Sequence, residues 1–421
     1  MRIALVVHKF PPASVGGTEV YTLNLARELS RRGHRVHVFY RHDTEAPGGL
    51  SGWEDREGFR AFRAGRPLSG LRGPLAQFLD TFFNPDLEAA FQSFLEEARP
   101  EVVHFQHLML LSYRLMGMVR RRGIPVLLTL HDYWYLCANS QLIWPDGVVC
   151  TGKALGLNCA RCTLARSGLP FWQAARPFAA PLLQLRDRLV RQAALQAGRW
   201  VAPSRFLIDQ YVRAGFPADA LSFLENGLDV ARIRSYAREE SVDGRIRFTF
   251  LGSLAWQKGV HVLVEAFRGV PPDRALLRVY GDPSVFPEYA ESLLRLADPS
   301  NTTLLGPVPN WEVGRVLANT DVLVVPSVWY ENSPLVVQEA FAAGVPVLAA
   351  DIGALTEKVE HGVSGWLCAP GNVQEWRRAV LRAIEQAGNL YGGTPEPLTI
   401  EAHVEALLNT YSSLSPVLQS L

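Results

Sequence analysis

The chain has 421 residues, a 48% share of hydrophobic residues and a formal net charge of +1. A single hydrophobic core rarely serves so long a chain, so we expect two or three domains. The balanced charge argues against a nucleic-acid partner, because such proteins usually carry a strong basic excess.

The first residues form a short apolar run that we interpret as a buried strand and not as a signal sequence. One basic residue precedes the run, Pro11-Pro12 follows it, and no small-residue cleavage site is present. No stretch of the sequence approaches the roughly 20 apolar residues that span a bilayer. These features predict a soluble, cytoplasmic protein.

Short apolar runs alternate with amphipathic segments along nearly the whole chain, in two series. The expected strands of the first series are Ile3–Val7, Arg35–Tyr40, Val102–Gln106, Pro125–Leu130, Trp200–Pro203 and Leu221–Leu224. Those of the second series are Ile246–Leu251, Leu276–Tyr280, Thr303–Leu305, Val322–Pro326 and Val345–Ala349. The expected helices include Glu19–Arg32, Val260–Phe267, Glu312–Asn319 and Leu335–Ala343. Continuously apolar strands are buried on both faces, which predicts α/β domains with parallel sheets covered by helices.

A polar, charged stretch at Arg234–Arg245 separates the two series. We therefore expect an N-terminal domain over residues 1–238 and a C-terminal domain over residues 239–395. The last part, residues 396–421, has helical spacing at Ile400–Leu414 and should pack back on the N-terminal domain. Doubly wound domains bind ligands beyond the carboxyl ends of their strands, so the loops there are the candidate sites.

The first such loop, Pro11–Glu19, contains Gly16 and Gly17 and opens a helix. Paired glycines let backbone N–H groups approach an anion at a helix N-terminus. The alternative is a plain strand-to-helix turn. The loop has neither the G-x-G-x-x-G pattern of dinucleotide dehydrogenases nor a Walker A motif.

A second candidate segment spans residues 331–339. Asn332 or Ser333 can cap a helix whose first turn suits Pro334, and Glu339 lies inside that helix. The helix start can bind phosphate while a carboxylate accepts hydrogen bonds from ribose hydroxyls. The alternative is a capped surface helix with two solvated glutamates, although the apolar neighbours of Glu339 disfavour it.

A third loop, Leu251–Gly259, opens the second series and ends in Lys258-Gly259. Such a lysine offers a flexible cation to a diphosphate. Taken alone, a loop lysine is usually just solvated.

Together these segments resemble the family-4 retaining glycosyltransferases over nearly the whole chain. In chain order, the resemblance rests on Gly16-Gly17, His131-Asp132, Pro203-Ser204, Asn226-Gly227-Leu228-Asp229, Gly252…Lys258-Gly259, Glu331…Glu339 and Gly344-Val345-Pro346-Val347. It implies a GT-B fold, with two Rossmann-like doubly wound domains facing a central cleft. It also implies transfer of a sugar from a nucleotide diphosphate sugar, a UDP- or GDP-sugar, to an acceptor that the sequence does not name. The implied chemistry needs no metal or cofactor, and no Asp-x-Asp motif ends a candidate strand.

The resemblance also implies roles for individual residues. His131 would lie beside the transferring sugar, Lys258 would neutralise the diphosphate, and Glu331 would contact the sugar hydroxyls. Glu339 would hold the ribose, and backbone groups at Val308 would meet the base. The full implied donor-binding set is Gly16, Gly17, Gly252, Ser253, Lys258, Val308, Asn332, Ser333, Pro334, Leu335 and Glu339.

Ser253 departs from the family pattern, which commonly has an arginine there that shares the diphosphate with the lysine. Either Arg205 or another base replaces it, or Lys258 acts with helix dipoles alone. The departure also supports a rival interpretation, a nucleotide-sugar-binding protein that has lost transfer. Other GT-B enzymes, such as an epimerase or a phosphorylase, are further alternatives.

Four of the five cysteines, namely Cys137, Cys150, Cys159 and Cys162, fall within one short stretch, in an insert over residues 134–165. Four thiolates suit tetrahedral zinc in a structural role, and the closing C-x-x-C is the strongest part of the pattern. Unliganded thiols or disulfides, and an iron–sulfur cluster, are the alternatives.

The stretch after the insert, residues 164–196, mixes apolar residues such as Phe171 and Phe178 with several arginines. It allows peripheral contact with an anionic membrane surface. Because Pro170, Pro177 and Pro181 should interrupt a long helix, we favour the simpler interpretation, a helix that packs on the N-terminal domain.

Overall fold

The computed structural model describes residues 1–14, 16–44, 51–67, 74–82, 84–166, 172–386 and 393–414. The chain divides into two compact units, unit 1 with residues 1–227 and 400–421, and unit 2 with residues 228–399. This division lies earlier than the boundary that we expected after residue 238. The polar stretch belongs to unit 2 because Arg234 donates a hydrogen bond to the Ala342 carbonyl and Arg238 forms an ion pair with Asp321.

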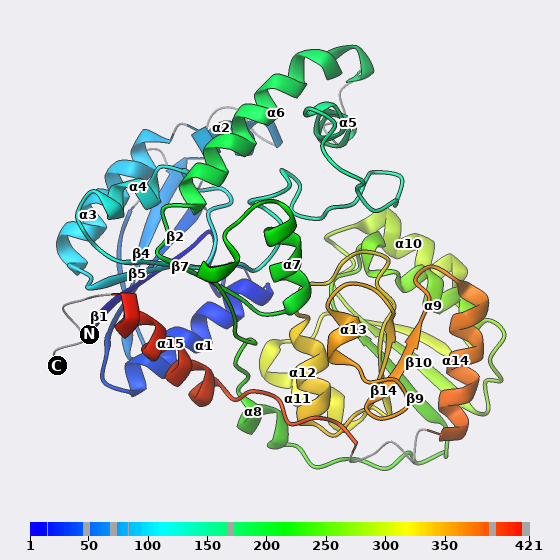
Figure 1. Ribbon diagram of the computed structural model, residues 1–421. Helices are drawn as coiled ribbons and strands as arrows, with labels where there is room; N and C mark the ends of the chain where they lie inside the picture. The colour runs from blue at the N-terminus through cyan, green and yellow to red at the C-terminus, as the bar shows by residue number, and fades with distance from the viewer. Residues whose placement is uncertain are drawn as a thin grey trace. The chain divides into compact units, whose positions relative to one another are not determined.

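Unit 1 is built on one twisted sheet that has eight strands among the described residues (Figure 1). The strands are β1 (Arg2–Val7), β2 (Arg35–Thr44), β3 (Gly52–Arg56), β4 (Phe59–Pro67), β5 (Val102–Phe105), β6 (Val126–Thr129), β7 (Arg199–Ala202) and β8 (Leu221–Phe223). Their order across the sheet is β3-β4-β2-β1-β5-β6-β7-β8. The described helices of this unit are α1 (Gly17–Arg31), α2 (Pro74–Phe82), α3 (Pro85–Ala98), α4 (Leu115–Arg120), α5 (Leu157–Ala165), α6 (Trp172–Ala194), α7 (Arg205–Arg213), the 3₁₀ turn η1 (Ala218–Ala220) and α15 (Ile400–Leu414).

One edge of this sheet differs from the parallel arrangement that we expected. Strands β3 and β4 pair antiparallel, with Arg56 opposite Phe59. The two residues between them form a tight turn in which Gly58 has a φ of +84°. Because glycine adopts a positive φ without steric cost, a hairpin is possible here in place of a crossover.

The C-terminal helix α15 packs on helix α1 in unit 1. Val404, Leu407 and Tyr411 share one buried cluster with Tyr21 and other apolar residues of α1. Two buried hydrogen bonds fix the orientation of α15. One joins the Tyr21 hydroxyl and His403 Nε2 (2.7 Å), and the other joins the Tyr411 hydroxyl and Nδ1 of His104 on β5 (2.7 Å). The last turns of the chain that the structure describes are therefore tied to the first sheet.

Helix α6 corrects the prediction that prolines would interrupt the stretch after the insert. It runs unbroken through Pro177 and Pro181 as a 23-residue helix, while Phe171 lies outside the described residues. A proline removes one helical hydrogen bond and usually bends or breaks a helix. Here both prolines are solvent-exposed, so water can satisfy the carbonyl groups that lose their partners.

Unit 2 holds a second sheet, with six parallel strands among the described residues. The strands are β9 (Ile246–Leu251), β10 (Ala275–Tyr280), β11 (Thr302–Gly306), β12 (Val322–Val325), β13 (Val347–Ala350) and β14 (Gly365–Cys368), in the order β11-β10-β9-β12-β13-β14. The helices and 3₁₀ turns are α8 (Val230–Arg234), η2 (Trp256–Lys258), α9 (Val260–Phe267), α10 (Pro287–Leu296), η3 (Asn310–Glu312), α11 (Val313–Ala318), α12 (Leu335–Ala342), α13 (Leu355–Lys358) and α14 (Val373–Gln386). This strand order is the doubly wound Rossmann order.

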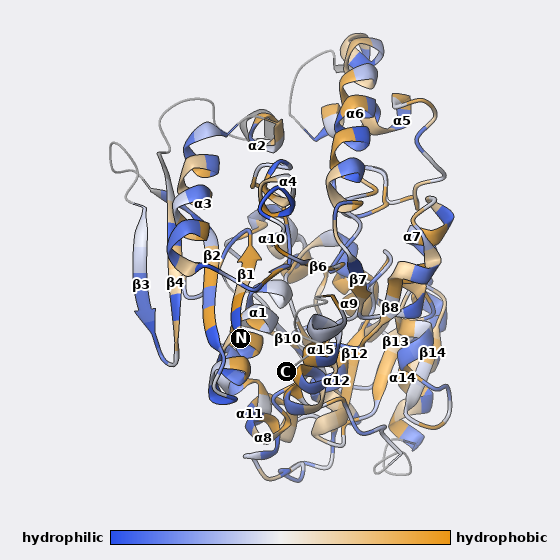
Figure 2. Ribbon diagram, turned by 60° about the vertical axis from the view of Figure 1, so that its left-hand side comes forward, coloured by the Kyte–Doolittle hydropathy of each residue, from blue (hydrophilic) through white to orange (hydrophobic). Residues whose placement is uncertain are grey.

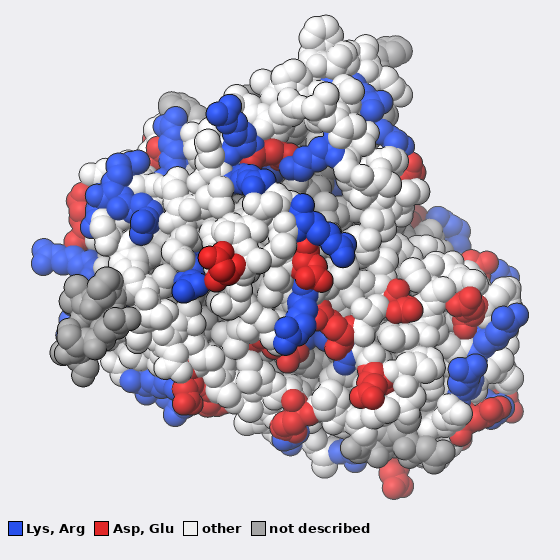
Figure 3. All heavy atoms as spheres, viewed as in Figure 1, with Lys and Arg blue, Asp and Glu red and all other residues white. Residues whose placement is uncertain are grey.

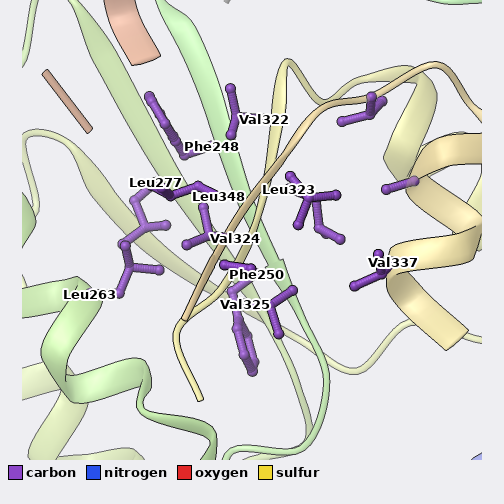
Figure 4. Packing of buried hydrophobic residues seen from close by; sticks show 14 of the residues in the cluster. Phe248, Phe250, Leu263, Leu277, Val322, Leu323, Val324, Val325, Val337 and Leu348 are labelled. Carbon is purple, nitrogen blue, oxygen red and sulfur yellow. The ribbon is translucent and has the colours of Figure 1, made fainter. Parts of the chain in front are cut away.

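The core of unit 2 explains why its strands are apolar on both faces. Phe248 and Leu323 on the central strands pack with Leu263 of α9 on one side and Val337 of α12 on the other (Figure 4). Figure 2 shows the same apolar strands as orange arrows lined by helices with a mixed polar surface. Burial on both faces is the pattern that the continuous apolar runs predict.

Candidate active site

In each sheet the strand order reverses next to the first strand of its series, and several of the predicted site residues follow the strands at these places. In unit 2 the reversal lies between the neighbouring strands β9 and β12. Lys258 lies in the loop after β9, and Glu331 lies in the loop after β12. Open α/β sheets bind their ligands at such switch points, beyond the carboxyl ends of the strands.

The two loops are held together by close backbone contacts. Gly259 has a φ of +70°, and a Cβ atom at this position would lie 1.9 Å from the Pro326 carbonyl oxygen. The amide of Val328 also donates a hydrogen bond to the Gln257 carbonyl (3.0 Å). Only glycine permits this approach, so Gly259 fixes the position of the lysine that precedes it.

Lys258 and Glu331 form an ion pair that is partly buried. The lysine Nζ lies 2.8 Å from Glu331 Oε1, and the side chains are 25% and 5% exposed, respectively. The same oxygen accepts hydrogen bonds from the Ser327 hydroxyl (2.6 Å) and the Trp329 indole N–H (3.0 Å). Three donors therefore converge on one carboxylate oxygen and orient the group.

The electrostatics of this pair keep the carboxylate charged. Burial alone would raise the pKa of Glu331, but the charge and hydrogen bond of Lys258 outweigh it, with help from Ser327 and Trp329. The net pKa lies below the ordinary value for glutamate. At neutral pH the site thus presents a fixed carboxylate beside a lysine ammonium group.

The start of helix α12 lies next along the chain. The structure corrects our assignment of its cap: the helix begins at Leu335, Pro334 occupies the N-cap position with a ψ of 114°, and no side chain caps it. The residue before a proline avoids the helical region, which keeps Ser333, and with it the preceding Asn332, outside the helix. Ser333 Oγ is buried without a hydrogen-bond partner among the described residues. The first amides of the helix and this hydroxyl are available to an anion.

Glu339 lies inside α12 and is 7% exposed. Its Oε1 pairs with Arg232 of helix α8 at 2.7 Å. Burial raises the pKa of this carboxyl and Arg232 lowers it, and the net pKa lies above the ordinary value. Arg232 also donates to the Asn310 carbonyl, so it links the glutamate to the loop after β11. Sequence reasoning missed this arginine, which gave no motif signal.

Val308 lies in the loop after β11 and lines a pocket of about 570 Å³. Tyr280, Pro309 and Arg278 line the same pocket. Val308 is the predicted donor-binding residue that lines this pocket.

Ser253 and Gly252 lie in the loop directly after β9. Ser253 is exposed. The Gly252 amide donates a hydrogen bond to the Tyr280 carbonyl at the end of β10 (3.1 Å). Arg205, one of the possible replacements for the usual arginine, belongs to unit 1, where its guanidinium lies 4.9 Å from the centroid of the Phe223 ring.

In unit 1 a polar cluster follows the strands at the corresponding reversal of strand order, between β1 and β5. Only His131 of this cluster was predicted as a site residue. The cluster consists of His8 after β1, Gln106 and His107 after β5, and His131 and Asp132 after β6. Their common sequence signal is a polar residue within a few positions of the end of a buried strand.

Hydrogen bonds connect the members of this cluster in pairs. His131 Nε2 lies 2.9 Å from Gln106 Oε1, and His107 Nε2 lies 3.0 Å from Asp132 Oδ2. Burial, followed by the charge of His107, lowers the pKa of His131 to about 3. His131 is therefore neutral at physiological pH and offers hydrogen bonds, not charge.

The glycine loop opens helix α1, with Gly16 at its N-cap and Val15 outside the described residues. A carboxylate already lies beside this helix start: a Cβ atom on Gly16 would approach Glu19 Oε2 to 2.5 Å. Ser14 donates to the other oxygen of Glu19, and His8 Nε2 lies 3.6 Å from it. By contrast, the Cβ position of Gly17 has no atom within 4 Å, which leaves room for close approach.

The four clustered cysteines are free thiols, and Cys137 and Cys150 lie close enough to Cys159 and Cys162 to disfavour their ionisation. Burial raises the pKa of Cys159 to about 12 and that of Cys162 to about 11, and the neighbouring thiols add to both shifts. In the described part of the chain, however, no three His, Cys, Asp or Glu side chains are arranged to hold a metal ion. The thiols thus gather without forming a metal site as they stand.

Sequence comparisons agree with this architecture. The family model described as Glycosyltransferase Family 4 matches residues 15–232, and the model described as Glycosyl transferases group 1 matches residues 245–386. The amylovoran biosynthesis glycosyltransferase AmsK of Erwinia amylovora is 26% identical over 230 residues, which is 52% of this chain and 55% of that protein. The match thus spans about half of this relative's length.

Solved structures show the same fold. Sucrose-phosphate synthase from Thermosynechococcus elongatus superimposes with a TM-score of 0.73 at 19% identity, covering 98% of each chain. Anabaena HepE in complex with UDP-glucose gives a TM-score of 0.62 at 18% identity, covering 100% of this chain and 99% of HepE. With two Rossmann-like α/β units and family models that match both, the chain belongs to the family-4 glycosyltransferases of the GT-B fold.

Proposed function

We propose that the chain transfers a sugar from a nucleoside diphosphate sugar to an acceptor, with retention of the anomeric configuration. The observation that carries this proposal is the Lys258–Glu331 pair at the switch point of unit 2. A cation suited to a diphosphate and a carboxylate suited to sugar hydroxyls lie side by side there. The first backbone amides at the start of α12 supply further donors to the phosphates.

The charge that develops in the reaction indicates how these groups act. Breaking the anomeric C–O bond leaves negative charge on the β-phosphate and positive character on the sugar. Lys258 stabilises the first, as preorganised donors do in general. Glu331, held ionised by its three donors, binds the sugar hydroxyls, and neutral His131 orients the same sugar by hydrogen bonding. In this proposal no metal ion takes part in the transfer.

The donor nucleotide is expected to lie along unit 2. We assign the ribose to Glu339 and the base to the pocket beside Val308. The solved structure of HepE with UDP-glucose supports a uridine diphosphate sugar, and a GDP-sugar is the second candidate. The acceptor, a glycan, lipid-linked or small-molecule alcohol, is assigned to unit 1.

A screen of UDP-, GDP- and ADP-sugars tests this proposal. A ligand at 100 times its Kd stabilises the folded protein by about 2.7 kcal/mol, so the matching donor should raise the melting temperature visibly. Incubation of that donor with an acceptor panel should release nucleoside diphosphate, and proton NMR of the product should show the anomeric configuration of the donor. A donor that binds without any release or transfer would favour the rival function, a binding protein, which Ser253 suggests.

For the insert we propose a structural zinc ion held by Cys137, Cys150, Cys159 and Cys162. The proximity of the four thiols supports it, although their side chains would have to close around the ion. Because the raised thiol pKa values mean that binding displaces protons, zinc affinity should increase with pH. The five cysteines are free thiols, which also suits the cytoplasmic location that we propose.

A further inference from the structure

Helix α6 has a buried face and an apolar exposed face. Ala180 and Leu183 pack toward helix α5 in a small buried cluster. On the other side, Phe178, Leu182 and Leu185 are 79%, 56% and 49% exposed. Residues spaced by three and four lie on the same side of a helix, so these three form one continuous stripe.

This stripe is unusual for a face open to water. Residues 177–185 contain no charged side chain, whereas the outward face of a surface helix is normally charged or polar. The insert adds apolar surface beside the stripe. Arg176 donates a hydrogen bond to the Leu157 carbonyl (3.0 Å), which holds this part of the insert beside the first turns of α6. The neighbouring Leu155 is 82% exposed. An apolar patch of this kind usually marks an interaction surface.

Positive charge borders the apolar stripe. Residues 134–198 contain seven Lys and Arg against two Asp and Glu, which gives this segment a net charge of +5 in a chain of +1. Both carboxylates are engaged in ion pairs, Asp146 with Arg161 and Asp187 with Lys153 and Arg186. Figure 3 shows the result as an uncharged end of α6, at the top of the view, with Lys and Arg side chains around it.

Among the described residues, the remaining cations of this segment form no ion pair with a carboxylate that would compensate their charge. Arg166 donates to the Gln141 side chain and the Ile143 carbonyl, and Arg176 donates to a carbonyl as described above. Arg188 is exposed at the far end of the stripe, one turn beyond Leu185. An apolar helical stripe between uncompensated arginines is the pattern of a helix that lies in a membrane interface.

We infer that the exposed face of α6 and the adjoining insert dock on an anionic lipid bilayer. Phe178, Leu182 and Leu185 would enter the boundary between headgroups and acyl chains, while the bordering arginines meet lipid phosphates. A second copy of this chain fits less well, because a two-fold contact would bring two surfaces of net positive charge together. The proposed contact is peripheral, and among the described residues no helix is long and apolar enough to cross a bilayer.

Vesicle flotation of the full-length chain tests the inference without donor or acceptor, so its outcome does not depend on the proposed reaction. The chain should float with vesicles of phosphatidylcholine containing 30% phosphatidylglycerol and bind pure phosphatidylcholine vesicles at least tenfold more weakly. Binding to the anionic vesicles should also weaken in 1 M salt, where the Debye length is about 3 Å. Failure of the wild-type chain to float with the anionic vesicles would overturn the inference.

Matched variants assign the binding to α6. The double substitution Phe178→Ser and Leu182→Ser should weaken binding to anionic vesicles at least tenfold, and Arg188→Glu should weaken it about fivefold or more. The controls lie on α10 of unit 2: Leu294→Ser, at a residue that is 61% exposed, and Arg295→Glu, at a side chain that is 71% exposed. Both controls should bind as the wild type does.

Two outcomes would contradict the assignment. Equal losses in the α6 variants and their controls would place the lipid contact elsewhere. A dimer in sedimentation velocity that Phe178→Ser dissociates, with no vesicle binding, would identify a second copy as the occupant. Because the substituted side chains are exposed, all variants should keep the thermal unfolding transition of the wild type, which circular dichroism checks.

Discussion

Replacing Lys258 by alanine leaves Glu331 buried without its cation, and the structure allows the consequence to be estimated. The carboxylate is 5% exposed and keeps only the Ser327 and Trp329 hydrogen bonds. Removing one partner of a buried ion pair typically costs about 3–5 kcal/mol. A matched control exists in Lys153, whose 2.6 Å pair with Asp187 involves a side chain that is 48% exposed. Lys153→Ala should cost at most about 1 kcal/mol, since exposed pairs contribute little.

The second consequence concerns pH. Without Lys258, burial should raise the folded-state pKa of Glu331 above its unfolded value. A raised carboxyl pKa means that the folded state gains a proton as the pH falls. The loss of stability in Lys258→Ala should therefore be full at pH 7 and shrink as the pH falls through that raised value. Adding Glu331→Gln should restore stability at pH 7, because the unpaired buried charge is gone.

Activity should behave differently from stability. Lys258→Ala should lower turnover by about a hundred- to a thousandfold, as expected when one charge-stabilising donor is lost. The double variant should regain stability without regaining turnover. Urea denaturation followed by fluorescence, together with single-turnover release of nucleoside diphosphate, measures both quantities. If Lys258→Ala keeps wild-type turnover, or loses no more stability than Lys153→Ala, the reasoning about this pair is refuted.

Four further predictions follow from the same structure. Glu339→Ala should weaken nucleoside diphosphate binding by about ten- to a hundredfold in calorimetry, the range for losing a hydrogen bond to a charged group; unchanged affinity would remove Glu339 from the ribose. Ser253→Arg should tighten that binding, and no change would show that the loop does not face the diphosphate. Protein purified under reducing conditions should contain about one equivalent of zinc, which Cys159→Ser should abolish; no bound metal would refute the zinc site. Burial lowers the pKa of His403 to about 4, so this residue should reduce the free energy of unfolding by about 1.4 kcal/mol per pH unit as the pH falls from 6.5 toward 4. In denaturation curves, His403→Gln should make the loss of stability with falling pH smaller.

Most strands of the two sheets follow directly from the sequence, whereas β3, β4 and β14 were not predicted. Runs such as Val322–Val325 are apolar at every position because both faces are covered, and this pattern predicts their burial without knowledge of their neighbours. The edge strand β3 was not predicted because Gly52–Arg56 is polar, and its pairing with β4 depends on a turn at Gly58, which has a positive φ. Helix α6 was misjudged because proline rules do not state whether a freed carbonyl can reach water.

The candidate site likewise contains residues that the sequence predicts and contacts that it does not. Lys258 and Glu331 stand in recognisable loops, so their positions after β9 and β12 could be predicted, but their direct pairing could not. It depends on the close approach of Gly259 to the Pro326 carbonyl, where a Cβ atom would lie only 1.9 Å from the oxygen, and Lys258 and Glu331 are 73 positions apart in the chain. Arg232 and the cluster around His131 gave no motif. They become visible only when the strand order places distant loops next to each other.

The most direct test of the central claim is calorimetric titration of UDP-glucose and GDP-mannose into the wild-type chain and into the Lys258→Ala and Lys153→Ala variants, followed by detection of the released nucleoside diphosphate. We predict that one of the two nucleotide sugars binds the wild type and Lys153→Ala alike. We further predict that both proteins release the nucleoside diphosphate as the sugar passes to an added acceptor alcohol or to water, while Lys258→Ala releases it at least a hundredfold more slowly. Folded wild-type protein that binds no nucleotide sugar, or a Lys258→Ala variant that releases the nucleotide as fast as the wild type, would contradict the claim that unit 2 holds the donor through this lysine.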